Sequence, residues 1–344
     1  MNFSYGRASR FTIFGASHAA EIGVTIEGLP AGTVIDRERL QAFLERRAPG
    51  RDELSTSRRE PDLVEFTAGV SACDEEGAEA KTVCADGGPL RAVIRNMDVR
   101  SGDYEAFRHT PRPGHADFAA MMQSGTTELP PGGGVFSGRM TAPLCIAGGI
   151  ALQLLEPQNI SVRAWPVMIG GETEEEQMRL AVARARDEGD SVGGIIQCEA
   201  SGVPAGIGEP MFGGIENRIA GIVFGIPAVK GIEFGAGFAA ASMRGSDHND
   251  PFFVEEGRVK TRSNHAGGIL GGITTGMPLV FRAAVKPTPS IAKEQDSVDM
   301  RSLTETKIRV GGRHDPCIVF RAVPVMEAAM ACALLDAMML RESA

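Results

Sequence analysis

The sequence predicts an α/β fold in which apolar helices lie between β-sheets. Two segments, 142–155 and 325–340, are almost entirely apolar, so each is expected to form a helix buried on all sides. Short stretches rich in β-branched and aromatic residues recur along the chain and are typical of strands. Buried helices among many short strands favour a layered sandwich. No low-complexity linker divides the 344 residues, so we expect a single domain over residues 1–344.

The expected strands are short and spread over the whole chain. One pair of strand-like segments, 252–254 and 258–260, flanks a Glu-Glu-Gly turn, and this pattern predicts a β-hairpin. Six other segments have the β-rich composition of strands: 11–14, 22–27, 63–70, 193–203, 279–286 and 307–310.

Two less apolar helices are also expected. Asp36 can cap a helix over 37–47, in which the apolar residues share one face. Thr173 and Glu176 form a capping-box pattern ahead of a helix over 178–186.

The charge balance excludes several classes of protein. With 44 acidic and 35 basic residues the formal net charge is −9, so the basic stripe of a nucleic-acid-binding protein is not expected. The N-terminus has no basic, apolar leader, and no run reaches the ~18 apolar residues of a membrane span. We therefore expect a cytoplasmic protein without nucleic-acid or membrane partners.

The six cysteines do not have the spacing of a metal site. No Cys-x-x-Cys pair occurs, so no zinc or other metal site is expected. A disulfide framework is not expected in a chain of this length either. We expect reduced, mostly buried thiols.

The basic residues are strongly biased towards arginine, with 29 arginines against 6 lysines. Genomic base composition explains such a bias equally well, but guanidinium groups also bind carboxylates and phosphates through two parallel hydrogen bonds. Five of these arginines lie within 46–59, close to four acids. This pattern fits either a solvated mixed-charge loop or a mobile anion-binding loop.

Histidines beside glycines mark the first candidate active-site segments. His18 follows a predicted strand in Gly-Ala-Ser-His and can face a cleft, although a lone histidine is more often structural. Arg112 and His115 lie in the turn Arg-Pro-Gly-His-Ala-Asp, which directs both side chains, and a neutral histidine can transfer protons near pH 7. The triple glycine at 132–134 leads towards the first apolar helix, and its backbone N–H groups suit an anion.

The C-terminal third carries three more candidate segments. Residues 263–272 form a glycine-dense turn. Lys286, Thr288 and Ser290 offer a cation and two hydroxyls to a phosphate. An Arg-His-Asp run at 313–315 precedes the second apolar helix. The order of these residues fits no Ser–His–Asp hydrolase.

Together these segments resemble the chorismate synthase family. The resemblance covers almost the whole chain and implies a sandwich of helices between antiparallel sheets, assembled as a homotetramer. Nine motifs in register make it far more specific than any single motif: 15–18, 58–62, 95–101, 112–117, 204–210, 228–231, 263–272, 286–290 and 312–317.

The resemblance also implies a reaction. The family catalyses the 1,4-anti elimination of phosphate from 5-enolpyruvylshikimate-3-phosphate to give chorismate, a carbon–oxygen lyase reaction of the shikimate pathway and of aromatic amino-acid biosynthesis. It requires reduced FMN although there is no net redox change, because the flavin donates electron density only transiently. NADPH is one candidate reductant for the flavin.

Roles follow from the resemblance residue by residue. His18 matches the histidine that protonates the departing phosphate, His115 the one that protonates the flavin near N1, and Asp315 the aspartate that assists proton transfer at flavin N5. The residues that match substrate ligands are Arg47, Arg112, Ser137, Arg139 and Arg313. The residues that match flavin contacts are Arg47, Val135, Phe136, Ser137, Pro227, Ala228, Gly271, Lys286, Pro287, Thr288, Pro289, Ser290 and Arg313.

The chain departs from the common family motifs at a few positions. Ala16 and Ala19 replace glutamate and glycine in the first motif, and Glu53 stands where a second loop arginine is common. Val135 lies in a stretch that lacks one arginine and one hydroxyl near the flavin, and Pro227 replaces an asparagine.

Two other functions remain open on the sequence alone. One is a flavin-dependent paralogue acting on another phosphate ester, and the other is a catalytically silent flavin-binding protein. His18, His115 and Asp315 occur together with four arginines, which argues against the silent protein, because stability does not require all seven. Fold alone does not separate the three functions.

Overall fold

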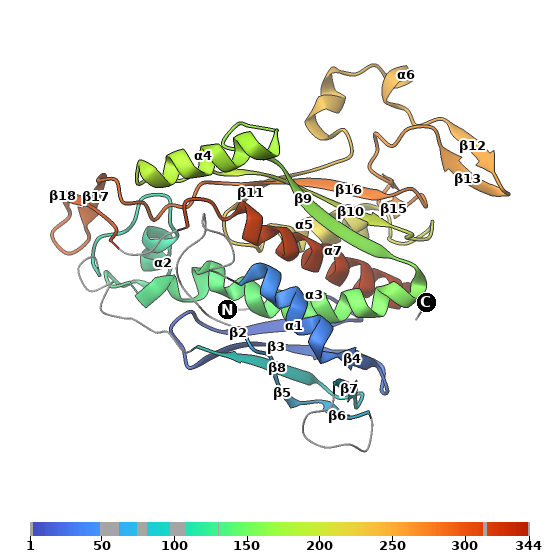
Figure 1. Ribbon diagram of the computed structural model, residues 1–344, viewed down its shortest axis with the longest axis horizontal. Helices are drawn as coiled ribbons and strands as arrows, with labels where there is room; N and C mark the ends of the chain where they lie inside the picture. The colour runs from blue at the N-terminus through green and yellow to red at the C-terminus, as the bar shows by residue number, and fades with distance from the viewer. Residues whose placement is uncertain are drawn as a thin grey trace.

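Two antiparallel sheets enclose a layer of helices in the computed structural model, which describes residues 3–48, 62–73, 81–96, 108–129, 131–311 and 315–342 (Figure 1). The strands of the first sheet are, in spatial order, β1 (Ser4–Tyr5), β2 (Arg10–Gly15), β3 (Glu21–Glu27), β8 (Leu90–Arg95) and β5 (Glu65–Ala68). The strands of the second sheet are β11 (Val229–Phe234), β16 (Leu279–Val285), β10 (Gly194–Ser201) and β9 (Ser161–Ile169). The predicted sandwich is confirmed.

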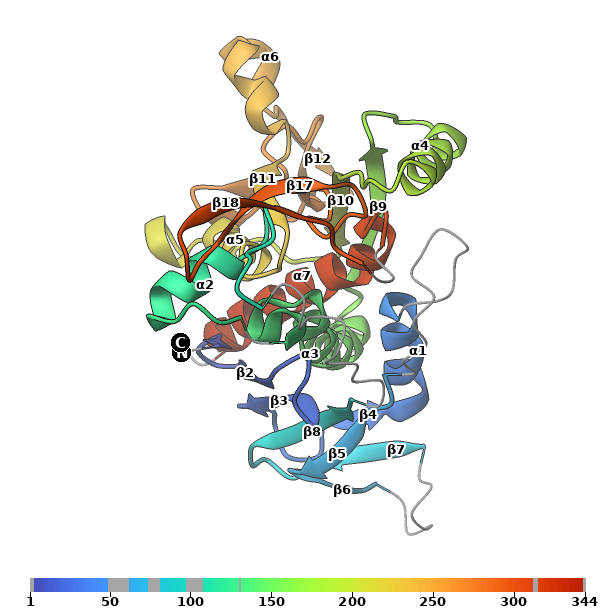
Figure 2. The ribbon, with the colours of Figure 1, turned by 90° about the vertical axis from the view of Figure 1, so that its left-hand side faces the viewer.

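The helical layer consists of α1 (Arg37–Arg47), α3 (Thr141–Leu155) and α7 (Val319–Glu342), which lie between the sheets in both views (Figures 1 and 2). α3 and α7 pack closely at Gly148, where an added Cβ would stand 2.2 Å from the Cβ of Ala328. Glycine is therefore required at this crossing, because any larger side chain would push the two helices apart.

The two apolar helices are longer than the sequence analysis expected. By length and composition α7 and the segment 138–158 could each cross a membrane, although charged residues interrupt both, so neither is an unbroken run of ~18 apolar residues. The most apolar part of α7 is 83% buried inside the protein, and that of 138–158 is 67% buried. An all-round apolar helix is stable in water only when other elements cover it, as the two sheets do here.

The N-termini of α1 and α4 (Glu175–Asp187) show which of the two predicted helix caps form. Asp36 caps α1, because its carboxylate accepts a hydrogen bond from the Arg39 N–H at 2.9 Å. The capping box predicted from Thr173 and Glu176 is wrong: α4 begins after Glu174, and no side chain among the described residues caps it. A capping box needs its first residue directly before the helix, and here the helix begins one residue later.

Smaller elements complete the fold, and the hairpin of β12 (Phe252–Glu255) and β13 (Arg258–Thr261) is confirmed. The strand predicted over 63–70 divides at Gly69, whose φ of +75° ends β5 and starts β6. The last predicted strand is shifted to 304–308. The remaining strands are β4 (Val34–Asp36), β6 (Val70–Ala72), β7 (Thr82–Ala85), β14 (Ile269–Leu270), β15 (Ile273–Thr274), β17 (Gln295–Asp299) and β18 (Thr304–Ile308). The remaining α-helices are α2 (Asp117–Ser124), α5 (Ile215–Val223) and α6 (Gly245–His248).

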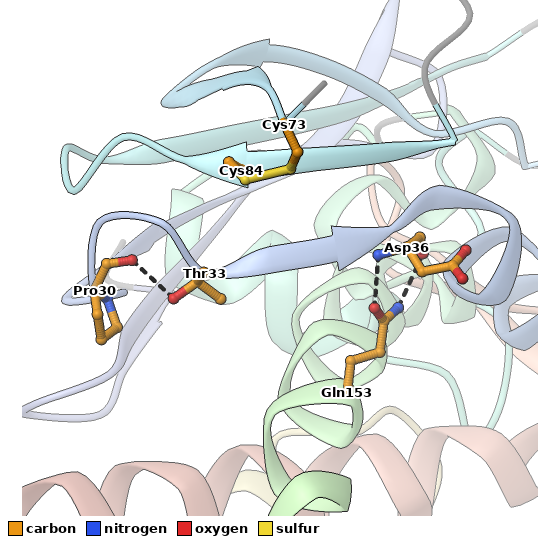
Figure 3. Close-up of a disulfide and its surroundings, with 6 residues drawn as sticks. All are labelled: Pro30, Thr33, Asp36, Cys73, Cys84 and Gln153. Carbon is orange, nitrogen blue, oxygen red and sulfur yellow. Dashed lines mark hydrogen bonds between the residues drawn. A yellow bond between two sulfur atoms is a disulfide. The ribbon is translucent and has the colours of Figure 1, made fainter. Parts of the chain in front are cut away.

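Two of the six cysteines form a disulfide, so the expectation of six reduced thiols is wrong. Cys73 follows β6 and Cys84 lies in β7, and their antiparallel pairing brings the two Cα atoms to 5.2 Å (Figure 3). That distance suits a disulfide. The prediction considered only spacing along the chain, whereas cross-strand neighbours are set by sheet register. The other four cysteines are free and buried, as predicted.

Buried ion pairs connect α7 to both sides of the sandwich. Asp336 accepts hydrogen bonds from the backbone N–H groups of residues 7–9 and from Arg218 at 2.9 Å. Glu327 accepts two hydrogen bonds from Arg46, at 2.6 and 2.9 Å. Both carboxylates are almost fully buried. Removing either partner would leave an unpaired charge in the core, which is strongly destabilising.

Candidate active site

Side chains predicted to bind substrate or flavin meet at one end of the helical layer. α1 ends there at Arg47, while α3 and α7 begin there at Thr141 and Val319. α2 and the β17–β18 hairpin lie at the same end (Figures 1 and 2). Helix N-termini carry a partial positive charge, so this end of the molecule suits anions.

Arg47 and Arg139 are held by one buried carboxylate, that of Asp62. Its Oδ2 accepts from the Nε and a terminal nitrogen of Arg47 at 3.3 and 2.8 Å, and its Oδ1 accepts from Arg139. Arg47 also donates to the Thr141 hydroxyl at 3.2 Å. Arg139 donates through Nε to Asn96 at 3.2 Å. One carboxylate thus joins the end of α1 to the turn that precedes α3.

Asp62 is ionised in this arrangement. Burial alone would raise the pKa of its carboxyl group, but the positive charges and hydrogen bonds of Arg47 and Arg139 hold that pKa below its ordinary value. The Asp62 side chain is fully buried, so water screens these interactions weakly. The cluster of two guanidiniums and one carboxylate keeps a net positive charge.

Asp315 is connected to this cluster through an arginine of α7. Arg321 donates to the Asp315 carboxylate and, through Nε, to the backbone carbonyl of Arg47 at 3.1 Å. Burial lowers the pKa of the Arg321 guanidinium, an effect that Asp315 opposes and Arg47 increases. A predicted proton-transfer residue and a predicted substrate ligand therefore share one partner.

Arg112 and His115 are held by a second buried carboxylate, that of Asp117 at the start of α2. Asp117 Oδ2 accepts from Arg112 Nε at 2.7 Å, and Oδ1 accepts from a terminal nitrogen of Arg112 at 2.9 Å and contacts His115 Nδ1. Arg112 also donates to the Ser290 hydroxyl at 3.3 Å. Burial would raise the pKa of Asp117, but hydrogen bonds from His115 and Arg112 hold it well below its ordinary value.

The predicted flavin segment 286–290 lies beside this second cluster. Lys286 donates through Nζ to the Gly114 carbonyl, and its backbone N–H donates to the Ala228 carbonyl at 2.9 Å. The hydroxyl of Thr288 is buried and has no hydrogen-bond partner among the described residues. Burying a hydroxyl without a partner costs about 1–3 kcal/mol. This orphaned hydroxyl therefore points to a ligand group at this position.

The glycine-rich loop before α3 joins both clusters to His18. The Gly134 carbonyl accepts from the Ser17 N–H at 3.2 Å, and the Ser17 hydroxyl lies 3.2 Å from His18 Nδ1. A Cβ at Gly133, where φ is +82°, would stand 3.1 Å from the His115 ring. Glycine is thus needed for the backbone conformation and for the approach of the imidazole.

Other predicted flavin residues line the same region. Val135 and Phe136 end the 3₁₀ turn Pro131–Phe136 and are half-buried. Ser137 accepts a hydrogen bond from the Arg139 N–H at 3.2 Å, so it also orients that arginine. Pro227 precedes Ala228, whose φ of +73° turns its carbonyl towards Lys286. Pro287 and Pro289 flank the orphaned hydroxyl of Thr288.

Gly271 is not brought to this site. It lies in the turn between β14 and β15, before β16 begins, whereas Lys286 directly follows the end of β16. The Val280 N–H donates to the Gly267 carbonyl at 3.1 Å, which ties this loop to the start of β16, and the seven residues of β16 span about 23 Å at roughly 3.3 Å per residue. Gly271 and Lys286 therefore lie towards opposite ends of β16. Arg313 and Glu53 lie outside the described residues, as does most of the arginine-rich segment 46–59.

Three residues that organise the site are not among those predicted from the sequence. Asp62 and Asp117 each hold a predicted arginine, and Arg321 holds Asp315. A usable signal existed for the two acids, because each closes a motif that also contains arginine. No local signal identified Arg321, which lies inside an apolar helix and meets Arg47 only through the tertiary fold.

The fold and the site together define a class of protein. The fold is a β-α-β sandwich, and arginines, histidines and the unsatisfied Thr288 hydroxyl lie where three of its helices meet. This set of groups is what a protein that binds small polyanions requires. Residues 9–339 match the family model described as chorismate synthase. On this match the chain belongs to the chorismate synthase family.

Individual relatives agree with the family match. A chorismate synthase of Chitinophaga pinensis is 47% identical over 339 residues, which cover 98% of this chain and 97% of the relative. One of Korarchaeum cryptofilum is 44% identical over 360 residues, covering 97% of each chain. A solved structure described as chorismate synthase has a TM-score of 0.73 and 25% identity, covering 98% of this chain and 93% of the other. These similarities favour the main interpretation over the paralogue and the silent protein.

Proposed function

We propose that this protein eliminates phosphate from 5-enolpyruvylshikimate-3-phosphate to give chorismate, as a lyase of the shikimate pathway. The observation that carries the proposal is the convergence of Arg47, Arg112 and Arg139 with His18 and His115 at one end of the helical layer. A substrate with one phosphate and two carboxylates needs several guanidinium partners. The histidines supply proton donors beside them.

The residues fit reduced FMN as the cofactor. Lys286, Ser290 and the orphaned hydroxyl of Thr288 offer a cation and two hydroxyls, which is the donor set that a phosphate group requires. Reduced FMN would supply transient electron density to the reacting carbon framework. The protein would supply the position, the positive charge and the protons.

Each catalytic residue has a proposed task on this chain. His18, beside the glycine-rich loop, gives a proton to the departing phosphate. His115 exchanges a proton at its ring nitrogen beside Gly133, where the flavin ring is expected to lie. Asp315, held by Arg321, would assist proton transfer at the position expected for flavin N5. Arg47, Arg112 and Arg139 orient the substrate anions and neutralise their charge.

We also propose a cytoplasmic homotetramer. Among the described residues, seven large apolar residues are between 64% and 86% exposed, namely Met211, Phe212, Phe238, Phe252, Val254, Val259 and Leu303. Val254 and Val259 face each other across the β12–β13 hairpin, and exposed apolar patches typically mark an interface. β15, which follows Gly271, lies at the end of the molecule that carries the β12–β13 arm, so we expect Gly271 to contact a flavin of a neighbouring copy (Figure 1). Light scattering should then give a mass of four 36.4 kDa chains.

The activity is tested directly with anaerobic protein, dithionite-reduced FMN and 5-enolpyruvylshikimate-3-phosphate. Chorismate and inorganic phosphate should form in equal amounts, and oxidised FMN should support neither product. Parallel reactions with NADPH in place of dithionite show whether the protein reduces its own flavin. Binding of FMN without release of phosphate would contradict the proposal and favour a silent flavin-binding protein.

A further inference from the structure

The strongest unassigned feature of the site is the Asp117 carboxylate, which has four hydrogen-bonding contacts. Its Oδ2 accepts from the backbone N–H and the Nε of Arg112 at 3.0 and 2.7 Å. Its Oδ1 accepts from a terminal nitrogen of Arg112 at 2.9 Å and contacts Nδ1 of His115. The side chain is 2% exposed, so these partners take the place of water.

This geometry determines which ring nitrogen of His115 carries the proton. An ionised carboxylate only accepts hydrogen bonds, so Nδ1 must present a hydrogen to it. Nε2 is then the nitrogen that remains to exchange a proton. It faces the glycine-rich loop, since a Cβ at Gly133 would lie 3.2 Å from it. A larger residue at 133 would close off that nitrogen.

The surrounding charges make the carboxylate necessary. A terminal nitrogen of Arg112 lies 3.1 Å from His115 Nδ1, and Lys286 contacts the neighbouring Gly114 carbonyl. Arg112 is thus a cation in direct contact with the imidazole, and Lys286 adds a positive charge at the next residue. Without Asp117 these positive charges would disfavour a proton on Nδ1, and Arg112 would lose the carboxylate that accepts from its Nε and a terminal nitrogen.

We propose that Asp117 is a positioning residue, which holds His115 in the Nδ1–H tautomer and locks the guanidinium of Arg112 in its substrate-binding orientation. The inference rests on the proposed function for its catalytic consequence. The tautomer itself is a property of the protein without FMN or substrate. Asp117 therefore acts on the reaction through its two neighbours and touches no reacting atom.

The variants Asp117→Asn and Asp117→Glu test this role. An asparagine can turn its amide to donate to Nδ1 and so stabilise the opposite tautomer, whereas a glutamate keeps the acceptor. We expect kcat to fall about 10–100-fold in Asp117→Asn, with partial recovery in Asp117→Glu. Glu128→Gln is the matched control, because Glu128 is a half-exposed carboxylate that pairs with Arg108 away from the clusters.

Nitrogen-15 NMR of the imidazoles in the FMN-free protein gives a readout independent of activity. Wild-type protein and Glu128→Gln should show His115 protonated at Nδ1 at pH 8, and Asp117→Asn should shift the proton to Nε2. A wild-type signal dominated by Nε2–H would overturn the proposal, even if Asp117→Asn fails to fold. An unchanged tautomer in a folded Asp117→Asn would also overturn it. The predicted tautomers with no turnover in wild-type protein would refute the proposed function and leave this inference standing.

Discussion

At the scale of single residues, three carboxylates set the charge of the site. Asp62 holds Arg47 and Arg139, Asp117 holds Arg112, and Asp315 is held by Arg321. Each guanidinium is thus fixed before any ligand arrives, which lowers the entropy cost of binding an anion. The arginines outnumber the acids, so the site keeps the positive charge that a polyanion requires.

The two histidines are expected to carry proton transfer. We predict that His18→Ala and His115→Ala each slow turnover by about 10²–10⁴-fold, which is the usual contribution of a positioned proton donor. FMN should still bind, because the proposed phosphate contacts at 286–290 are untouched. Single-turnover rates with reduced FMN measure the effect. Near-wild-type rates in both variants would remove the histidines from the mechanism.

Asp62 makes stability depend on pH. Its pKa is lower in the folded protein than in the unfolded chain, so its contribution is fully present above about pH 4 and is lost as the pH falls further. Asp62→Asn should cost about 3–5 kcal/mol at pH 7, because Arg47 and Arg139 lose their buried partner.

Urea unfolding at pH 7, 5 and 3.5 measures this effect for both proteins. The difference in the free energy of unfolding between wild type and Asp62→Asn should narrow at pH 3.5, because Asp62 begins to take up a proton there in the unfolded chain and not yet in the folded protein. Asp296→Asn is a suitable control, since Asp296 is largely exposed and its removal should change little. If the difference in the free energy of unfolding between the two proteins stays constant over the three pH values, Asp62 is not the titrating group.

At the scale of elements, helix ends build the site and strand register builds the disulfide. β4 pairs with β7 and ends at Asp36, which caps α1, and α1 in turn ends at Arg47 (Figure 3). Gln153 of α3 fixes this corner through two hydrogen bonds with the backbone of Asp36, at 2.8 and 3.0 Å. The small β4-β7-β6 sheet therefore supports the helix that carries a predicted substrate ligand.

The disulfide should stabilise this small sheet. Joining Cys73 to Cys84 closes a short loop, which predicts about 2–3 kcal/mol of stabilisation in the oxidised protein. Thermal unfolding with and without a strong phosphine reductant measures it. Reduction should lower the Tm of the wild type and leave Cys73→Ala/Cys84→Ala unchanged. Equal Tm values for the oxidised and reduced wild type would show that the bond adds no stability.

At the scale of the whole molecule, a net charge of −9 surrounds a positive site. Substrate affinity should therefore weaken as salt rises, because ions screen the attraction between the guanidiniums and the substrate. Calorimetric titrations at about 0.05 and 0.5 M salt measure the dependence. Arg139→Ala should bind more weakly at both concentrations and show a smaller salt effect. Salt-independent binding would mean that the arginine cluster does not hold the substrate.

The sequence by itself determined the layered fold, since two all-apolar helices are stable only when sheets cover both of their faces. It also determined which motifs carry chemistry, because histidine, arginine and glycine occur there in patterns that folding alone does not require. The position of α1 and its Asp36 cap followed from local rules. These features depend on near neighbours in the chain, which a sequence displays directly.

Only the tertiary structure decided how distant side chains pair. Asp62 meets Arg139 across 77 positions and Arg321 meets Arg47 across 274, and no local pattern encodes such contacts. The Cys73–Cys84 bond depends on sheet register, and the distance of Gly271 from Lys286 depends on the length of β16. Burial then sets the charge of each pair, because the balance between desolvation and a neighbouring guanidinium exists only after the chain has folded.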